Sequence, residues 1–302
     1  METALLWIPF TLLAAFAQVL RNGAQAGLTA KIGTLGATQV RFVFGFPFAV
    51  LFLISALLIG GERLPPLSAP VLGWSLLGAV SQIAGTALML TVMQWRGFGV
   101  AYAYIKTEPV LVALLGVMLL GDHLPLLAWL AIAVVTVGVV LASTRPGDLG
   151  KLVEEARPAL IGVAGGAGFG LSAIAFRAAI DGLPEGVFIL RSLTILAVSL
   201  AMQTAMLGVW LAVRDRQAFM GSVREWRASL GAGFLGALAS AGWFTAFSLT
   251  IAANVRTLGL IEMPIAALLA HRISGKGLGR NEAIGFALVT GGVALLLAVQ
   301  AA

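Results

Sequence analysis

The 302-residue sequence contains no cysteine and only two histidines, His123 and His271. Disulfides and thiolate metal sites are therefore excluded. Both histidines fall near the ends of apolar runs, which does not suggest a histidine metal site. We expect no cofactor and no bound metal.

Charged residues are also scarce, at 11% of the chain against 60% hydrophobic residues, and the mean hydropathy is +1.00. Soluble domains carry about 25% charged residues, so this inventory cannot cover a water-exposed surface. The 37 glycines suit membrane helices that pack backbone to backbone. Composition predicts an all-α polytopic membrane protein.

The net charge of +6 does not indicate nucleic acid as a partner. Lys and Arg stand singly in short links between apolar runs, as flanking charges do in membrane proteins, and no basic stripe with interleaved aromatics occurs. The N-terminus has no basic stretch before its first apolar run, which predicts a retained helix instead of a cleaved signal.

Ten apolar segments of roughly bilayer-spanning length can be counted, and they predict ten transmembrane helices. Short links rich in glycine, proline and charge separate them. Two halves of five helices, residues 1–144 and 158–302, are joined by a connecting loop at 145–157. The segments are 4–26, 37–60, 71–95, 98–120, 125–143, 158–180, 186–213, 228–251, 253–274 and 282–299.

The two halves match each other at a fixed offset of 154 residues, which places Glu108 on Glu262. Ala113–Leu115 then falls on Ala267–Leu269, and Gly138 on Gly292. Such a match indicates an internal duplication. Because five is odd, the second copy enters the membrane in the opposite sense, which predicts an inverted repeat with a shared central cavity.

These residues carry a resemblance to a known family. Glu108-Pro109, then Ala113 to Gly116, Leu119 to Asp122 and Gly138-Val139, resemble the EamA-type repeat of the drug/metabolite transporter superfamily. The second copy is similar but inserts Met263 before Pro264 and has Lys276 where the acid usually follows the glycine. The ten-segment form, with Arg-Phe in the second segment, looks most like the YddG-type exporters of aromatic amino acids.

Ionisable groups inside a bilayer cost about 2.5–3.5 kcal/mol each on insertion scales and are candidates for function. Two interpretations stay open for the acids: a coupling or gating carboxylate, or a structural ion pair with Lys106 or an arginine of another helix. We expect the arginines to pair with acids or to snorkel to the interface; binding of a substrate carboxylate is the less favoured alternative. The gating or structural candidates are Glu108, Pro109, Glu262, Pro264, Arg41 and Arg191.

Substrate-binding residues should be neutral polar or aromatic groups at mid-segment depth. Amides and hydroxyls can bind a zwitterion, and aromatic rings can stack on an apolar side chain. The alternative for tyrosine and tryptophan is the interfacial belt. The candidates are Gln18, Ser81, Gln82, Thr86, Tyr102, Tyr104, Ser240, Trp243 and Thr245.

The sequence therefore predicts a monomeric exporter of small metabolites that works by alternating access, with aromatic or hydrophobic amino acids as the favoured substrates, and not an enzyme. The alternative is a proton-coupled exporter of drugs or cations, although the first segment has Gln18 and no acid. We expect a bacterial inner-membrane protein, and positive charge in the links after odd-numbered segments predicts that both termini are in the periplasm.

Overall fold

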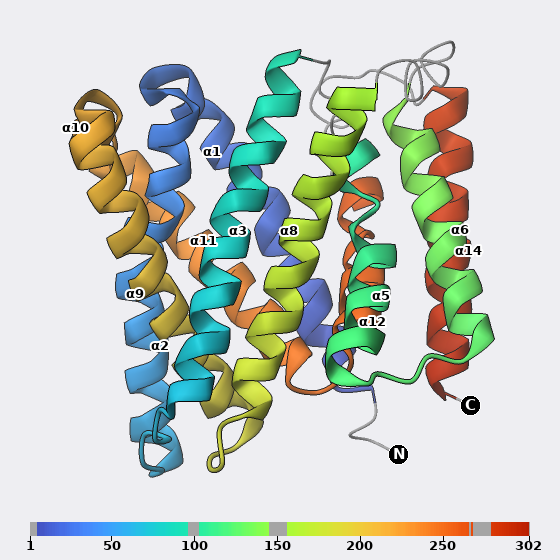
Figure 1. Ribbon diagram of the computed structural model, residues 1–302, viewed down its shortest axis with the longest axis horizontal. Coiled ribbons are helices and arrows are strands. Elements are labelled where there is room, and N and C mark those ends of the chain that lie inside the picture. The colour runs from blue at the N-terminus through green and yellow to red at the C-terminus, as the bar shows by residue number, and fades with distance from the viewer. Residues whose placement is uncertain (1–4, 96–102, 145–155, 266, 268–278, 302) are drawn as a thin grey trace. The chain divides into compact units, whose positions relative to one another are not determined.

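The computed structural model describes residues 5–95, 103–144, 156–265, 267 and 279–301 (Figure 1). All regular secondary structure within these residues is helical, which confirms the predicted all-α class. The helices are α1 (Trp7–Val43), α2 (Gly45–Gly60), α3 (Ala69–Trp95), α5 (Glu108–Leu120), α6 (Leu126–Ser143), α8 (Ala156–Asp181), α9 (Phe188–Arg214), α10 (Arg216–Arg224), α11 (Trp226–Phe247), α12 (Ala252–Gly259) and α14 (Arg280–Ala301).

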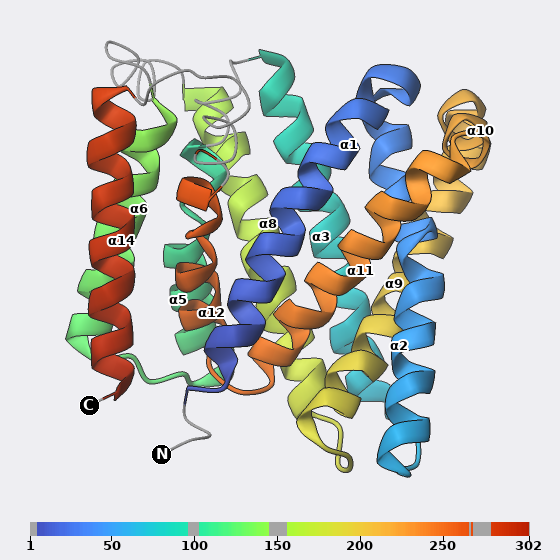
Figure 2. The same cartoon turned by 180° about the vertical axis from the view of Figure 1, so that it is seen from behind.

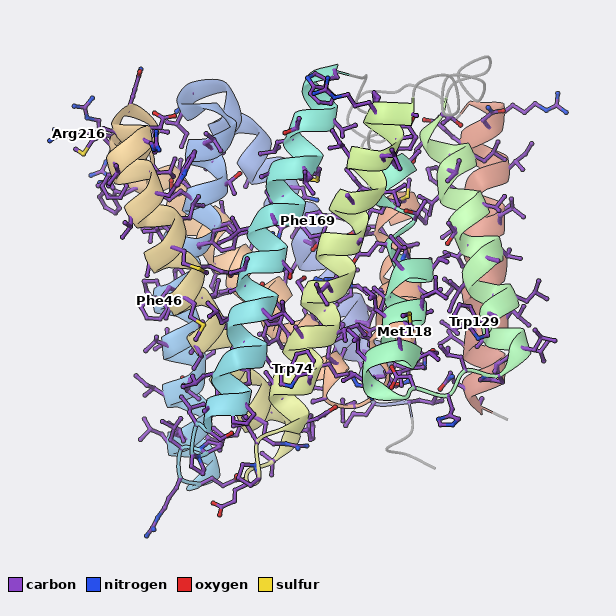
Figure 3. The ribbon with its side chains drawn as sticks, in the orientation of Figure 1. Phe46, Trp74, Met118, Trp129, Phe169 and Arg216 are labelled. Atoms are coloured by element: carbon purple, nitrogen blue, oxygen red, sulfur yellow. The ribbon has the colours of Figure 1, made fainter. Side chains whose placement is uncertain are left out.

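In the described part of the chain, eight helical spans are long and apolar enough to cross a membrane. Side chains along the helices are almost entirely carbon, whereas nitrogen-tipped ones such as Arg216 stand at helix ends (Figure 3). This pattern is that of a multi-pass membrane protein. The spans are Leu35–Gly60, Ala69–Val92, Ala103–Leu120, Leu126–Ser143, Ala156–Asp181, Phe188–Arg214, Trp226–Phe247 and Arg280–Ala301.

The predicted segments 4–26 and 253–274 are not among these eight spans. The first is helical but belongs to the 37-residue helix α1, which contains the polar Gln18, Arg21 and Asn22. The second begins as α12, which has only eight residues. Residues 268–274 lie outside the described part.

The link expected between the first two segments is mostly helical. Helix α1 continues to Val43, and its one non-helical residue is Gly33, with φ 71° and ψ 173°. Residues with a Cβ rarely adopt such a positive φ, so a glycine is needed at this kink. Periodicity did not reveal this helical continuation because polar residues occupy it.

The chain divides into two compact units. The first unit is Met1–Ile8, Ala84–Ile174 and Thr250–Ala302, and the second unit is Pro9–Ile83 and Ala175–Leu249. Each unit therefore draws residues from both halves of the sequence. The division into repeats at 1–144 and 158–302 describes the predicted duplication, and it stays a prediction.

In the first unit, α6 and α14 lie side by side along their length (Figure 2). Glycines let their backbones meet: a Cβ on Gly285 would lie 2.5 Å from the carbonyl oxygen of Gly138, and one on Gly292 2.6 Å from Val135 Cγ2. Small residues at an interface allow this approach, which gains van der Waals contact where the hydrophobic effect gives little.

One face of helix α8, in the first unit, also packs closely through glycines. Gly162, Gly166 and Gly170 recur every four residues, and a Cβ on them would lie 2.5 Å from Tyr104 Cβ, 2.8 Å from the Ile105 carbonyl oxygen and 3.2 Å from Val112 Cγ2. This glycine face therefore packs against residues 104–112.

The second unit is built on α2, α9 and α11, which contact one another. The ring of Phe234 on α11 meets Phe48 and Phe52 of α2 edge to face, with centroids 5.4 and 6.1 Å apart. Gly242 lets α11 approach α1, because a Cβ there would lie 2.8 Å from the Phe10 carbonyl oxygen. The short helix α10 begins at an Asp215 cap that accepts from the Ala218 N–H at 3.0 Å.

Adding one methyl group at Gly285 should destabilise the first unit. The new Cβ would meet backbone atoms of α6, which cannot rotate away, and overpacking of this kind costs roughly 1–3 kcal/mol. Gly291→Ala, on the same helix with nothing within 4 Å, is the matched control. We expect a lower thermal unfolding temperature for purified Gly285→Ala than for Gly291→Ala, and equal temperatures would contradict the close packing of α6 and α14.

Candidate functional site

Two helices of the first unit are interrupted immediately before an acid. Residues 103–105 are helical, Lys106 and Thr107 form a turn, and α5 begins at Glu108. Likewise α12 ends at Gly259, residues 260–261 form a turn, and helix resumes at Glu262. The expected continuous helices 98–120 and 253–274 are thus broken, in their described parts, at corresponding places.

The prolines that follow explain the interruptions. Pro109 has no N–H for the carbonyl of Ile105, and Pro264 has none for the carbonyl of Leu260. The turns satisfy nearby groups instead: the Thr107 hydroxyl donates to the Tyr104 carbonyl at 2.7 Å, and the Met263 N–H donates to the Leu260 carbonyl at 3.1 Å. Gly166 comes close to the carbonyl oxygen of Ile105.

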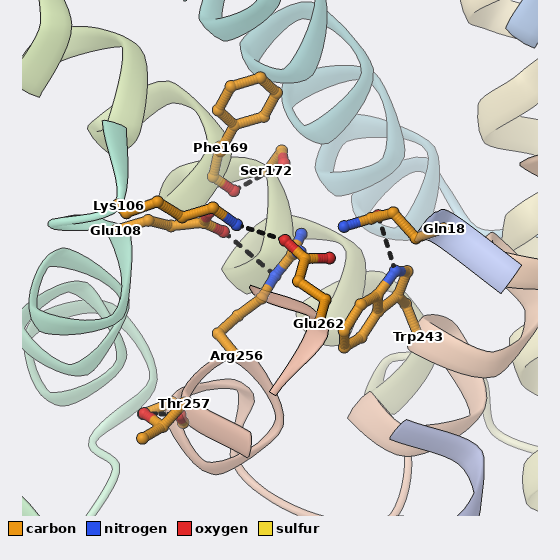
Figure 4. A network of polar contacts seen from close by, with 10 residues as sticks. Gln18, Lys106, Glu108, Phe169, Ser172, Trp243, Arg256, Thr257 and Glu262 are labelled. Atoms are coloured by element: carbon orange, nitrogen blue, oxygen red, sulfur yellow. Dashed lines mark hydrogen bonds and ion pairs between the residues drawn. The ribbon is translucent and has the colours of Figure 1, made fainter. Parts of the chain in front are cut away.

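Both buried acids are held in ion pairs that join residues 106–108, at the first break, to residues 256–262, around the second break (Figure 4). Lys106 Nζ lies 2.6 Å from Glu262 Oε1, and Arg256 Nε lies 3.1 Å from Glu108 Oε1. The Glu262 side chain is 6% exposed and that of Glu108 is 9% exposed. These four residues are called the ion-pair cluster below.

The crossed pattern matches the structural interpretation of the acids. Each glutamate takes its partner from the other interrupted helix, so the cluster ties the two breaks together. A buried carboxylate is tolerated only when it is paired and hydrogen-bonded, and both acids meet a cation at short distance. Lys106 forms its ion pair with Glu262 and not with its near neighbour Glu108.

The second unit contains a different polar set, made largely of neutral groups. Trp243 Nε1 on α11 donates to Gln18 Oε1 on α1 at 3.2 Å, and both are drawn in Figure 4. Gln203 Nε2 on α9 donates to Gln82 Oε1 on α3 at 2.7 Å. Trp243, Gln82 and Gln203 are buried.

The structure thus brings together some of the predicted substrate residues. Gln18 contacts Trp243, whereas Gln82 contacts Gln203, which the sequence analysis missed although it is a lone amide within an apolar segment. Tyr102 lies outside the described residues. The other predicted substrate residues are all buried: Ser81, Ser240 and Thr245 in the second unit, and Thr86 and Tyr104 in the first.

Arg41 and Arg191 lie in different settings within the second unit. Arg41 is in α1, where a Cβ on Gly236 would lie 3.7 Å from its Cγ and 3.4 Å from Arg21 Cδ. Arg191 is in the first turn of α9. The Arg191 side chain is partly buried.

A hollow of about 420 Å³ lies where α3 ends and α8 begins, within the first unit. The guanidinium of Arg157 stands over the Trp95 ring there, 5.0 Å from its centroid. Trp95, Ala156, Arg157 and Pro158 line it, and none is a predicted substrate residue.

Comparison with known proteins agrees with this architecture. Residues 5–144 match the EamA-like transporter family. This part of the chain is similar to that family, and the match covers a little less than half of the chain. A solved crystal structure of another protein shares the fold with a TM-score of 0.69 over 96% of this chain and 97% of that one, and its 18% identity shows the fold alone. No curated protein matches the chain.

The eight apolar helical spans indicate a multi-pass membrane protein, and the family that residues 5–144 resemble is one of transporters. The EamA-like match covers the acid Glu108 and its proline, on which the sequence resemblance was based. This match does not distinguish the predicted YddG-type specificity for aromatic amino acids from other substrate specificities.

Removing one partner of the Lys106–Glu262 pair should be more harmful than removing both. Lys106→Met or Glu262→Gln leaves one buried group uncompensated, which costs about 3–5 kcal/mol, whereas the double variant leaves none. We expect the double variant to unfold at a higher temperature than either single variant.

The exposed pair Lys31–Glu225, at 3.2 Å, is the control for this cycle. The Lys31 side chain is 60% exposed, so Lys31→Met should cost less than about 1 kcal/mol. Additive losses in the Lys106 and Glu262 cycle would show that the two groups do not stabilise each other.

Proposed function

We propose that the protein is an exporter of small metabolites, with aromatic or hydrophobic amino acids as its substrates, that works by alternating access through a central cavity between its two repeats. The observation that carries the proposal is the partly buried hydrogen bond between Trp243 and Gln18. An indole next to an amide offers an apolar face and polar groups without net negative charge, which suits an aromatic zwitterion.

The proton-coupled exporter of drugs or cations is the weaker alternative. It requires a carboxylate available to a cation or a proton, and both acids of the ion-pair cluster already have a cation within 3.1 Å. In addition, α1 carries Gln18 and no acid between Trp7 and Val43. These contacts favour a fixed structural role for Glu108 and Glu262.

Alternating access needs helices that can change direction within the membrane. The interruptions at Lys106–Thr107 and at residues 260–261 supply such points, and discontinuous helices are a recurrent feature of transporters with inverted repeats. We infer that the interrupted ends move as one body because the ion-pair cluster joins them.

The same proposal covers location and assembly. We propose a location in a bacterial inner membrane, and the basic residues concentrated in alternate links favour both termini on the periplasmic side. We also propose that the protein works as a monomer.

Solute counterflow in proteoliposomes tests the substrate class. We expect saturable uptake of labelled phenylalanine and tryptophan that a pH gradient does not change. Trp243→Phe keeps a ring but loses the N–H donor, and one buried hydrogen bond is worth about 0.5–1.5 kcal/mol. The half-saturating concentration should therefore rise roughly 2- to 10-fold.

Trp210→Phe is the control, because Trp210 is 48% exposed on α9. Equal effects of the two tryptophan substitutions would remove Trp243 from the substrate site. Uptake of tetraphenylphosphonium alone, only with a pH gradient and abolished by Glu108→Gln, would replace amino-acid export by cation–proton exchange.

A further inference from the structure

The short helix α10 joins the ends of two membrane spans in the second unit. The span Phe188–Arg214 ends just before α10 begins at Arg216, and the next span begins at Trp226. Figure 2 shows α10 beside the start of α11. Its nine residues extend about 14 Å, less than half of a bilayer core of about 30 Å. Helix α10 therefore lies where the spans end, at the level of the lipid headgroups.

One face of α10 is packed against α1. A Cβ on Gly221 would lie 3.2 Å from Ile32 Cγ2. The Ser222 hydroxyl donates to Gln39 Oε1 at 3.2 Å, and both of these side chains are buried. Ala218, one helical turn before Ser222, is buried as well. These contacts fix which side of α10 faces the protein, and they hold the helix in that rotation.

The opposite face of α10 combines cationic and apolar side chains. At 3.6 residues per turn, Arg216, Met220, Val223 and Arg224 share the side away from α1. Met220 is 39% exposed and Val223 is 44% exposed, and both arginines are exposed as well. Figure 3 shows Arg216 pointing away from the neighbouring helices. Within the described residues of the second unit, this face has no helix packed on it.

The acids near α10 are already engaged, which leaves its arginines as net positive charge. Asp215 Oδ1 accepts from the Ala218 N–H at 3.0 Å, and Glu225 Oε2 lies 3.2 Å from Lys31 Nζ. In the part of the chain that the structure describes, no ion pair joins an acid to any of the four arginines between residues 214 and 227. These arginines are Arg214, Arg216, Arg224 and Arg227.

We propose that the outward face of α10 binds the headgroups of anionic phospholipids. The guanidinium groups of Arg216 and Arg224 contact lipid phosphates, which they match with directed donors. Met220 and Val223 between them insert among the carbons nearest the headgroups. A short amphipathic helix with arginine and apolar side chains is suited to a charged membrane surface. The proposal goes beyond export, because it concerns the lipid around the protein and not the transported molecule.

Amide hydrogen exchange of the purified full-length protein in an uncharged detergent tests the proposal at α10 itself. Dioctanoylphosphatidylglycerol is titrated in, and exchange of residues 216–224 reports how much of the site is filled. We expect this lipid to slow exchange there and dioctanoylphosphatidylcholine to do so only at higher concentration. Arg216→Gln and Arg224→Gln should each raise the half-saturating concentration about fivefold, which corresponds to about 1 kcal/mol per basic residue at an anionic surface.

Arg63→Gln is the matched control, because Arg63 is an exposed arginine of the same unit in the link after α2. It removes the same charge from the protein, and its half-saturating concentration should equal that of the wild type. Inorganic phosphate at the same concentration is the second control, and it should leave exchange of residues 216–224 unchanged.

Equal half-saturating concentrations for the two lipids, or equal effects of Arg63→Gln and Arg216→Gln, would overturn the proposal. Slowing by inorganic phosphate to the same extent would also overturn it, since the site would then bind a free anion and not a lipid. None of these measurements uses transport, so their failure leaves amino-acid export in place.

Discussion

The pairing of buried charge is the constraint on which the first unit depends. A carboxylate inside an apolar helical bundle is costly, and Glu108 and Glu262 are tolerated because each has a cation within 3.1 Å. The partners come from across the pair α5 and α12, so the electrostatic requirement of each helix is met by the other. The ion pairs therefore hold the two interrupted helices together at their breaks.

Close backbone packing supplies the rest of the cohesion. Apolar side chains gain little by leaving lipid, so contact area has to come from surfaces that fit closely. The glycines between α6 and α14 and along one face of α8 provide such surfaces. A carbonyl freed by Pro109 faces Gly166 in the same packing, which links the helix break to the glycine face.

The second unit carries polar groups of another kind. Amides, an indole and Arg21 are buried there, while its acids lie in links or at helix ends. In the proposed function, the ion-pair cluster has a structural role, and Trp243 and Gln18 of the second unit contact the substrate.

Much of this could be predicted from the sequence, because long apolar runs and glycine spacing depend on local composition. Glu108 and Pro109 were identified from the sequence as gating or structural candidates, and the helix break lies immediately before them. Lys106 and an arginine of another helix were named as possible partners, but the sequence does not tell which acid each one pairs with: Lys106 is two residues from Glu108 but pairs with Glu262 across 156 positions. The sequence analysis missed that α1 continues to Val43, because polar residues in this stretch interrupt the run of apolar residues.

A charge exchange tests most directly whether the buried acids serve as ion-pair partners. Lys106→Glu and Glu262→Lys should each abolish phenylalanine counterflow, whereas the protein carrying both changes should regain it, because opposite charges again face each other. An exchanged protein that folds with wild-type stability but transports nothing would contradict the account, since it would show that the carboxylate of Glu262 itself takes part in transport.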